Sequence, residues 1–368
     1  MDLVKVRQDL HRIPELAFNE YKTTDYIYNL LKDYSDLELI KVNPTGLIAV
    51  YKGGTGDYVL FRSDIDALPL KEQTDCNFHS EHEGTMHACG HDIHMTVLLG
   101  FIHEVCTTKP KKNLLFLFQP AEEGKGGAEH ILRSKVLDQW PIKTALALHC
   151  SPDYHVGEVA TKGGIFFGIP EEFIVEFHGR NAHAAFPHKG IDAIYAGVQF
   201  YNLMQSQITK RFSSTDPVIF HIGKFEGGDA ENILASKCLL QGTHRTLTPE
   251  NHRAMNELIL STGKAVAAVT GAEFKFREVS VYEAVNNDQF VYNNFKKTIE
   301  NLDDIKFIEA ESVMTGEDFG FFTTLYPSLL FWLGTGLSEH GLHSPYYLPD
   351  QEAVETGIRV YMALLERM

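Results

Sequence analysis

The sequence predicts an α/β protein with a mostly parallel sheet covered by helices on both faces, into which a ferredoxin-like α+β domain is inserted. Continuously apolar segments such as 114–118 and 329–333 alternate with helical segments, as strands buried on both faces do. From about residue 169 the order becomes strand–helix–strand–strand–helix–strand, the ferredoxin-like split unit. We therefore expect one domain from residues 1–168 and 286–368, and an inserted domain from 169–285.

The individual elements follow from apolar spacing and turn residues. Leu3, Val6, Leu10 and Ile13 recur at nearly helical spacing, and Tyr26, Leu30 and Leu31 indicate a second helix. Continuous apolar runs bounded by turn residues predict the strands. In the first domain we expect strands at 47–51, 58–61, 114–118 and 144–148, a helix over 93–106, and a late strand at 329–333. In the inserted domain we expect strands at 173–177, 218–225, 237–242 and 272–281, with helices over 190–210 and 249–269.

Composition restricts the partners and the compartment. The 368 residues include 33 Lys and Arg against 49 Asp and Glu, a formal net charge of −16. An acidic chain lacks the basic face that nucleic acids and anionic membranes require, so neither is an expected partner. No apolar run approaches a membrane span, and the first residues lack the layout of a signal peptide. Five scattered cysteines without CxxC spacing fit a reducing compartment, so we expect a cytoplasmic protein.

Three predicted strands run directly into polar residues. Asp64 and Asp66 follow the strand at 58–61, Glu122 and Glu123 follow that at 114–118, and His149 ends that at 144–148. One acidic residue at a strand end is usually a turn or a helix cap. Because sites in open α/β sheets lie beyond the carboxyl ends of the strands, three such endings favour a metal site at one edge.

The segment 87–94 carries the densest group of metal-binding side chains. Cys89 and His91 flank Gly90, and a tight turn there aims both side chains at one point just before a helix. The helix N-terminus is expected to favour the thiolate of Cys89. Read alone, the segment also fits a surface histidine cluster that caps a helix. The remaining histidines of this stretch are expected to be solvated (His79 and His82) or to be packing residues (His94 and His103).

Glu122 and Glu123 are informative because two adjacent carboxylates repel one another unless a cation lies nearby. On a bend, one can bind a metal while the other takes a proton from water, as hydrolytic metal sites require. The alternative is an acidic loop at a helix start. Near the C-terminus, either His340 or His343 could complete the ligand set, and spacing does not choose between them.

The motifs together resemble the metal-dependent amidohydrolases that include hippurate hydrolase and the plant auxin–amino acid hydrolases. The match spans nearly the whole chain. It rests on residues 62–69, 87–92, 119–124, 147–149 and 183–188, which occur in this order. Four further segments, 11–16, 314–320, 331–334 and 339–343, are most similar to members that remove an acetyl group from an amino acid.

The resemblance implies two divalent metal ions, zinc or manganese foremost, with cobalt and nickel also allowed. Their implied ligands are Cys89, His91, Glu123, His149 and His343. Glu122 matches the general base, although adjacency leaves both Glu122 and Glu123 as catalytic candidates. Asp64 and Asp66 match the acidic strand end behind the metals, where one of them orients His91.

The inserted domain is expected to complete the site. His183 matches a histidine that stabilises the oxyanion, sometimes across a homodimer, and Asn232 and Arg245 match residues that bind a substrate carboxylate. The implied activity is hydrolysis of the amide of a small N-acetylated amino acid. Two alternatives remain: a related hydrolase of the hippurate or aminoacylase type, and a non-catalytic metal-binding protein. The Glu122–Glu123 pair argues against the second.

Overall fold

The computed structural model describes residues 1–367, and the chain divides into two compact units. Unit 1 comprises Met1–Phe166, Val285–Glu311 and the chain from Glu317 onward, and unit 2 comprises Phe167–Ala284 with Ser312–Gly316. The sequence predicts that all of 286–368 belongs to the first domain. The short segment at 312–316 differs because its backbone pairs with unit 2, where Gly168 N donates to Val313 O at 2.9 Å.

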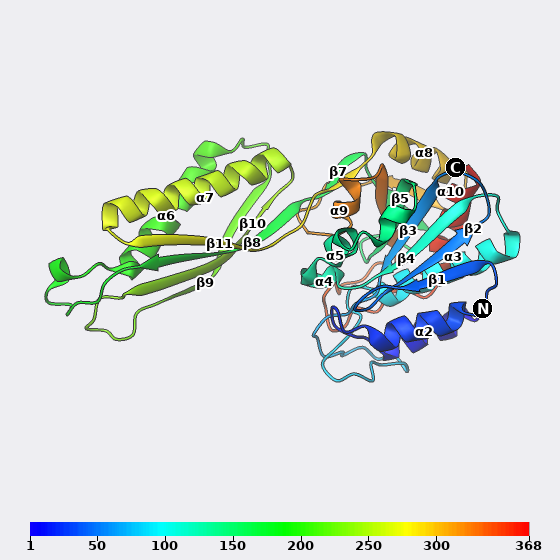
Figure 1. The fold of residues 1–368 in the computed structure, drawn as a ribbon, viewed down its shortest axis with the longest axis horizontal. Coiled ribbons are helices and arrows are strands. Elements are labelled where there is room, and N and C mark those ends of the chain that lie inside the picture. Colours follow the sequence, from blue (N-terminus) through cyan, green and yellow to red (C-terminus); the bar gives the residue numbers. More distant parts are fainter. Residues whose placement is uncertain (368) are drawn as a thin grey trace. The chain divides into compact units, whose positions relative to one another are not determined.

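Unit 1 is built on an eight-stranded sheet (Figure 1). Its strands lie in the order β1-β2-β4-β3-β5-β14-β6-β13, and the central run β4-β3-β5-β14 is parallel throughout. β1 and β2 add to one side antiparallel, which makes the sheet mixed but mainly parallel. The strands are β1 (Leu37–Lys41), β2 (Leu47–Lys52), β3 (Tyr58–Asp64), β4 (Asn113–Gln119), β5 (Ile142–Ser151), β6 (Glu158–Thr161), β13 (Lys306–Glu309) and β14 (Ser328–Gly334).

Helices cover both faces of this sheet, as the continuous apolar runs predict. Every residue of β3, β4 and β14 is buried, which requires cover on both sides. On one face, Phe61 of β3 packs at 4.7 Å from Phe101 and 5.0 Å from Tyr361, ring centre to ring centre. The helices are α1 (Leu3–Arg12), α2 (Tyr21–Leu31), α3 (His91–Thr108), α4 (Glu122–Lys125), α5 (Gly127–Arg133), η1 (Val136–Gln139), α8 (Gln289–Ile299), α9 (Gly320–Thr323) and α10 (Ala353–Arg367).

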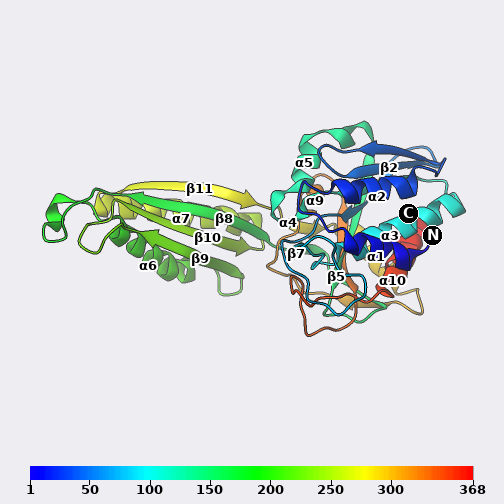
Figure 2. The same cartoon turned by 90° about the horizontal axis from the view of Figure 1, so that it is seen from below.

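Unit 2 has the ferredoxin-like order that the sequence predicts. Its four strands form an antiparallel sheet in the order β11-β8-β10-β9, and α6 and α7 both cover one face (Figure 2). Burial alternates along β8, as expected of a sheet covered on one side. The elements are β8 (Ile169–His178), η2 (Pro187–Lys189), α6 (Ala193–Arg211), β9 (Val218–Gly227), β10 (Lys237–Thr246), α7 (Pro249–Thr270) and β11 (Glu273–Val281).

Two short strands, β7 (Gly164–Phe167) and β12 (Val285–Asn287), pair with each other as a separate two-stranded sheet. They occupy the two stretches where the chain leaves and re-enters unit 1. Within residues 1–367, no helix has both the length and the apolar character needed to cross a membrane.

Candidate metal centre

Three strand ends meet at one edge of the unit 1 sheet. Because β3 runs parallel to both β4 and β5, their carboxyl ends lie side by side. Asp64 ends β3, Glu122 and Glu123 follow β4, and His149 lies near the end of β5. The helix α3 begins at His91, immediately after the segment that holds Cys89. The sheet topology thus brings together residues that are far apart in the sequence.

The sulfur of Cys89 belongs to two groups of potential metal-ligand atoms. It is 3.4 Å from His149 Nε2 and 3.5 Å from His343 Nε2, and His343 Nε2 is 3.3 Å from Glu123 Oε1. Cys89, His91 and His149 form one group, and Cys89, Glu123 and His343 form the other, with the ligand atoms in each within 4.8 Å of one another. Two donor groups that share one sulfur can hold two adjacent cations.

The structure distinguishes between the two C-terminal histidines that spacing left open. His343 N donates to Ala88 O at 2.9 Å, which ties this residue to the segment that holds Cys89. The ring of His340 instead lies 5.1 Å from that of Tyr346, centre to centre. Only His343 therefore joins the donor groups described here.

The backbone at Gly90 accounts for the convergence of Cys89 and His91. Gly90 has φ +83° and caps the N-terminus of α3, and a Cβ there would lie 3.0 Å from the Cβ of Cys150 and 3.1 Å from its sulfur. Only glycine fits both the conformation and the space. Ala121 (φ +59°) and His343 (φ +66°) are non-glycine residues in the left-handed region, and such backbone conformations concentrate at functional sites.

Hydrogen bonds orient two of the imidazole rings. Nδ1 of His91 lies 2.8 Å from the backbone oxygen of Asp66, and Nδ1 of His149 lies 2.8 Å from that of Cys150. In each ring Nδ1 therefore donates its proton to a carbonyl oxygen, so Nε2 is the nitrogen that can bind a cation. Among residues 1–367, Nε2 of His91 has no hydrogen-bond partner. The carboxylate contacts expected of Asp64 and Asp66 are longer, with Oδ2 of Asp64 at 3.5 Å from Nε2 of His91 and Oδ1 of Asp66 at 3.6 Å from Nδ1.

His94 is not the packing residue that the sequence predicts. Its Nδ1 lies 2.6 Å from Oδ1 of Asp64, and its Nε2 accepts the backbone N–H of Cys150 at 2.8 Å. The ring is buried and links the end of β3 to the end of β5. The pattern of apolar neighbours on α3 suggested packing, whereas the polar partners come from two distant strands.

Arg62 is a buried residue of this site that sequence reasoning did not single out. Its guanidinium donates to Asp64 Oδ2 at 2.9 Å, to Glu317 Oε1 at 2.9 Å and to Asp318 Oδ1 at 2.8 Å. The available signal was an arginine inside an otherwise apolar strand, because a buried cation requires anionic partners. Arg62 thereby fixes the segment at 317–318 behind the strand ends.

Glu122 and Glu123 face different surroundings despite being neighbours. Oε1 of Glu122 accepts the backbone N–H of Asp318 at 3.4 Å, and burial together with the charges of Glu317 and Glu123 raises the pKa of Glu122 well above its usual value. Burial also opposes ionisation of Glu123, but hydrogen bonding to His343 and the charge of His91 outweigh it and lower its pKa. The non-helical φ of −74° and ψ of 86° at Glu123 separate the two side chains.

The charge balance of this edge fits a divalent cation. Burial and the carboxylates of Glu123 and Glu122 raise the pKa of the Cys89 thiol well above its usual value. The helix N-terminus, expected to favour the thiolate, is therefore outweighed. Burial also raises the pKa of Asp318 to about 7. Sulfur, imidazole and carboxylate donors in a buried site with excess negative charge are what a zinc-type ion requires.

The predicted residues of unit 2 fall into two places. His183 is exposed on the loop after β8, where it pairs with Ile233, and Ala184 N donates to Asn232 O at 2.9 Å. Arg245 lies near the other end of β10, opposite Pro170, and its guanidinium donates to Met314 O at 3.1 Å. Along β10, the eight residues from Lys237 to Arg245 extend over roughly 27 Å, which is nearly the whole length of the strand. The fold thus joins the segments of His183 and Asn232 and separates both from Arg245.

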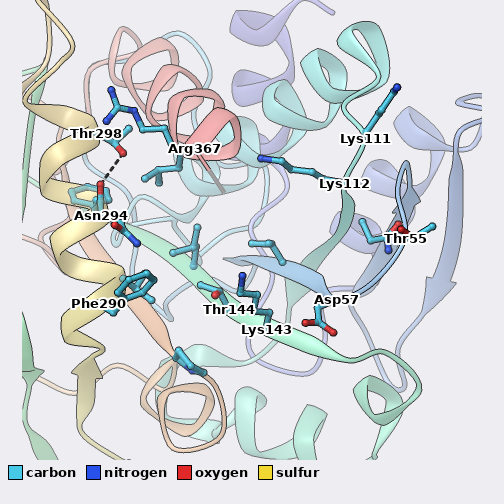
Figure 3. A pocket seen from close by; sticks show the side chains of 17 residues that line it. Thr55, Asp57, Lys111, Lys112, Lys143, Thr144, Phe290, Asn294, Thr298 and Arg367 are labelled. Atoms are coloured by element: carbon cyan, nitrogen blue, oxygen red, sulfur yellow. Dashed lines mark hydrogen bonds between the residues drawn. The ribbon is translucent and has the colours of Figure 1, made fainter.

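A cavity of about 460 Å³ lies at the opposite edge of the unit 1 sheet (Figure 3). It is lined by the starts of the same strands, including Val59, Asn113 and Thr144, and by the Phe290 side of α8. Lys143 and Arg367 also reach it. None of the predicted site residues lines this cavity, so it is separate from the candidate metal centre.

Residues 60–367 match the peptidase family M20/M25/M40. The chain is 41% identical to the N-acetyldiaminopimelate deacetylase of Bacillus subtilis (strain 168), covering 98% of this chain and 96% of the relative. It is 39% identical to that of Bacillus pumilus (strain SAFR-032), covering 99% and 97%. Among solved structures, a Bacillus subtilis dinuclear metal-binding peptidase of the M20 family aligns with a TM-score of 0.86 and 30% identity, covering 99% and 96%. A putative aminohydrolase from methicillin-resistant Staphylococcus aureus aligns with a TM-score of 0.93 and 26% identity, covering 98% and 95%.

Proposed function

The chain belongs to the peptidase family M20/M25/M40, and on that premise we propose that it hydrolyses the acetyl amide of N-acetyl-LL-2,6-diaminopimelate. The products are LL-2,6-diaminopimelate and acetate, in the diaminopimelate route to lysine. The full-length similarity to N-acetyldiaminopimelate deacetylases supports this substrate. The observation that carries the hydrolytic chemistry is the pair of donor groups that share the sulfur of Cys89.

Two divalent metal ions, zinc or manganese foremost, fit these groups, and cobalt and nickel suit the same donors. Cys89, His91 and His149 would hold one ion, and Cys89, Glu123 and His343 the other. When bound, such ions polarise an amide carbonyl and lower the pKa of water in the site. Two aspartates position the residues around these donors. Asp66 accepts the backbone N–H of Glu123, and Asp64 contacts the ring of His94.

Glu122 is the general base in this proposal. Glu123 contacts His343 and lies within the donor group of Cys89, whereas Glu122 is outside both groups and hydrogen bonds to the Asp318 amide. A carboxylate beside the cations but not bound to them can take a proton from water and deliver it to the leaving amine. His183 would donate to the oxyanion as it develops.

Unit 1 is then the catalytic domain and unit 2 a lid and dimerisation domain. Asn232 and Arg245 would bind the substrate carboxylates. However, Asn232 precedes the first residue of β10, Arg245 lies near its last residue, and about 27 Å of strand lies between these two ends. One acylated amino acid cannot span that distance. We therefore propose a cytoplasmic homodimer, formed through unit 2, in which His183 and Asn232 of one copy serve the site of the other.

The test is amide hydrolysis by purified protein loaded with zinc or manganese, measured as acetate from acetyl substrates and as benzoate from N-benzoylglycine. N-acetyl-LL-2,6-diaminopimelate is compared with N-benzoylglycine and with a panel of N-acetylated amino acids at equal concentration. Acetate release that is highest from the diaminopimelate derivative supports the proposal. Preferential cleavage of N-benzoylglycine or of another acyl amino acid points instead to a hippurate hydrolase or aminoacylase. Tight metal binding without hydrolysis of any substrate indicates a non-catalytic metal-binding protein.

A further inference from the structure

The chain between β3 and α3 forms an unusually long loop beside the candidate metal centre. From Ile65 to Gly90 the structure has no helix and no strand beyond the isolated bridges of Ala67 with Leu16 and Leu68 with Met86. Loops of this length are uncommon in compact domains and need their own anchoring or serve a function. This loop leads directly into Cys89 and His91, so its position affects both residues.

Three metal-ligand atoms of different kinds converge within this loop. Cys76 Sγ lies 3.6 Å from Glu72 Oε1 and 4.0 Å from His79 Nδ1, and these last two atoms are 3.5 Å apart. The point equidistant from the three atoms lies roughly 2.2 Å from each, within the range of zinc bonds to sulfur, nitrogen and oxygen. The spacing in the sequence is also short, because Cys76 and His79 are separated by only two residues.

The surroundings hold Glu72 in place and leave one side of the group open. Ser80 N donates to Oε2 of Glu72 at 2.7 Å, while Oε1 accepts the Thr74 hydroxyl at 2.5 Å and lies beside Cys76 and His79. Nε2 of His11 lies 3.2 Å from the same Oε1, and its other ring nitrogen lies 2.9 Å from Asp92. This contact is the kind that orients a metal-binding carboxylate. The side chain of Glu72 is 5% exposed and that of His79 is 51% exposed, so an ion can enter from the His79 side.

We propose that Glu72, Cys76 and His79 form a zinc-binding site, separate from the metal centre, that fixes the loop at 65–90. Binding replaces the Sγ–H bond of Cys76 with a sulfur–zinc bond and releases the proton to solvent. Water occupies the open fourth position on the exposed side. A cation that closes part of a long loop stabilises the folded state, because it removes conformational freedom from the unfolded chain.

The first test counts zinc ions. Wild-type protein, Cys76→Ser and His79→Gln are saturated with zinc, desalted and analysed for zinc per chain. We expect each variant to retain one ion fewer than wild type. Cys106→Ser and His82→Gln are the matched controls, since Cys106 is a buried cysteine on α3 and His82 instead contacts the Pro14 carbonyl oxygen and Lys22. Equal zinc content in wild type, Cys76→Ser and His79→Gln would overturn the proposal.

A second test removes the other thiolate ligand candidate. Cobalt added to Cys89→Ser is expected to give a thiolate-to-cobalt absorption band from Cys76, and the band is expected to disappear in Cys89→Ser combined with Cys76→Ser. Amide hydrogen exchange of residues 70–86 should slow on zinc addition in wild type and not in His79→Gln. Absence of the band in folded Cys89→Ser, together with unchanged exchange in wild type, would contradict the site. Neither readout depends on amidohydrolase activity, so failure of the proposed function would leave this result unaffected.

Discussion

Nε2 of His343 lies 3.3 Å from Oε1 of Glu123, although these residues are 220 positions apart in the sequence (343 − 123). The contact assigns Glu123 to the same donor group as Cys89. Its neighbour Glu122 takes part in neither donor group and accepts the Asp318 amide instead. Two adjacent carboxylates thus acquire different partners, and the proposed division between ligand and general base follows from that difference.

Gly90→Ala should weaken both folding and metal binding. The substitution places a Cβ 3.0 Å from Cys150 at a φ of +83°, so we expect a loss of about 1–3 kcal/mol of unfolding free energy and weaker zinc binding. Urea unfolding and zinc titration measure the two effects. Gly223→Ala is the control, because a Cβ at that position would lie 3.8 Å from Nε2 of His221, an ordinary contact distance. Equal effects of the two substitutions would show that the turn at Gly90 has no special requirement for glycine.

Arg62→Met should be among the most destabilising single substitutions in unit 1. It leaves Asp64, Glu317 and Asp318 buried without their cation, and breaking such a pair costs about 3–5 kcal/mol. Arg133→Met is the control, since its partner Glu129 is a surface residue and such pairs contribute about 0–1 kcal/mol. Denaturant unfolding of both variants measures the difference. A loss below 1 kcal/mol for Arg62→Met would contradict the described network.

Unit 2 contains a buried carboxylate whose effect on stability depends on pH. Burial alone would raise the pKa of Glu171, but hydrogen bonds from His244, His252 and Asn256 lower it to about 2 from an ordinary 4.5. A lowered folded-state pKa means that the ionised group stabilises the fold above about pH 4.5, and that this is lost as pH falls toward 2. Glu171→Gln should therefore cost on the order of 2–3 kcal/mol at pH 7 and progressively less below pH 4.5.

Unfolding of Glu171→Gln and wild type at pH 7, 5, 4 and 3 measures that difference. Glu250→Gln provides the control on the same unit, because Glu250 is an exposed residue at the start of α7. A cost for Glu171→Gln that stays constant across this pH range would show that the carboxylate charge does not contribute.

The proposed shared site can be tested by mixing two inactive variants. Glu122→Gln lacks the base and His183→Ala lacks the oxyanion donor, so each homodimer should be nearly inactive. A mixed dimer retains one complete site if His183 acts on the partner copy, and random exchange should restore about a quarter of wild-type activity. Activity of subunit mixtures after dissociation and reassociation measures this. No recovery in mixtures that demonstrably form mixed dimers would place His183 in the site of its own chain.

Much of the framework could be predicted from local patterns. Continuous apolar runs located β3, β4, β5 and β14, and parallel pairing then required their polar ends to meet. Short strands could not be identified in this way. In β13, for example, none of the four residues is buried, and the strand forms because it pairs with β6. Local pattern contains little information about such tertiary contacts.

The finer features of the site depend on contacts that spacing cannot show. His343 could not be chosen over His340, because the choice depends on a left-handed backbone and a bond to Ala88. The helix that follows Cys89 predicts a thiolate, but burial and the carboxylates of Glu123 and Glu122, which follow β4, oppose it. His94 was assigned to packing for the same reason, since Asp64 and Cys150 come from different strands.

The separate roles of Glu122 and Glu123 are tested most directly by metal content and turnover of Glu122→Gln and Glu123→Gln, with Glu129→Gln as a surface control. The account predicts that Glu122→Gln retains both ions of the metal centre and loses roughly 10²–10⁴-fold in turnover, whereas Glu123→Gln loses metal. Wild-type turnover in Glu122→Gln, or loss of metal from Glu122→Gln while Glu123→Gln retains both ions, would contradict it.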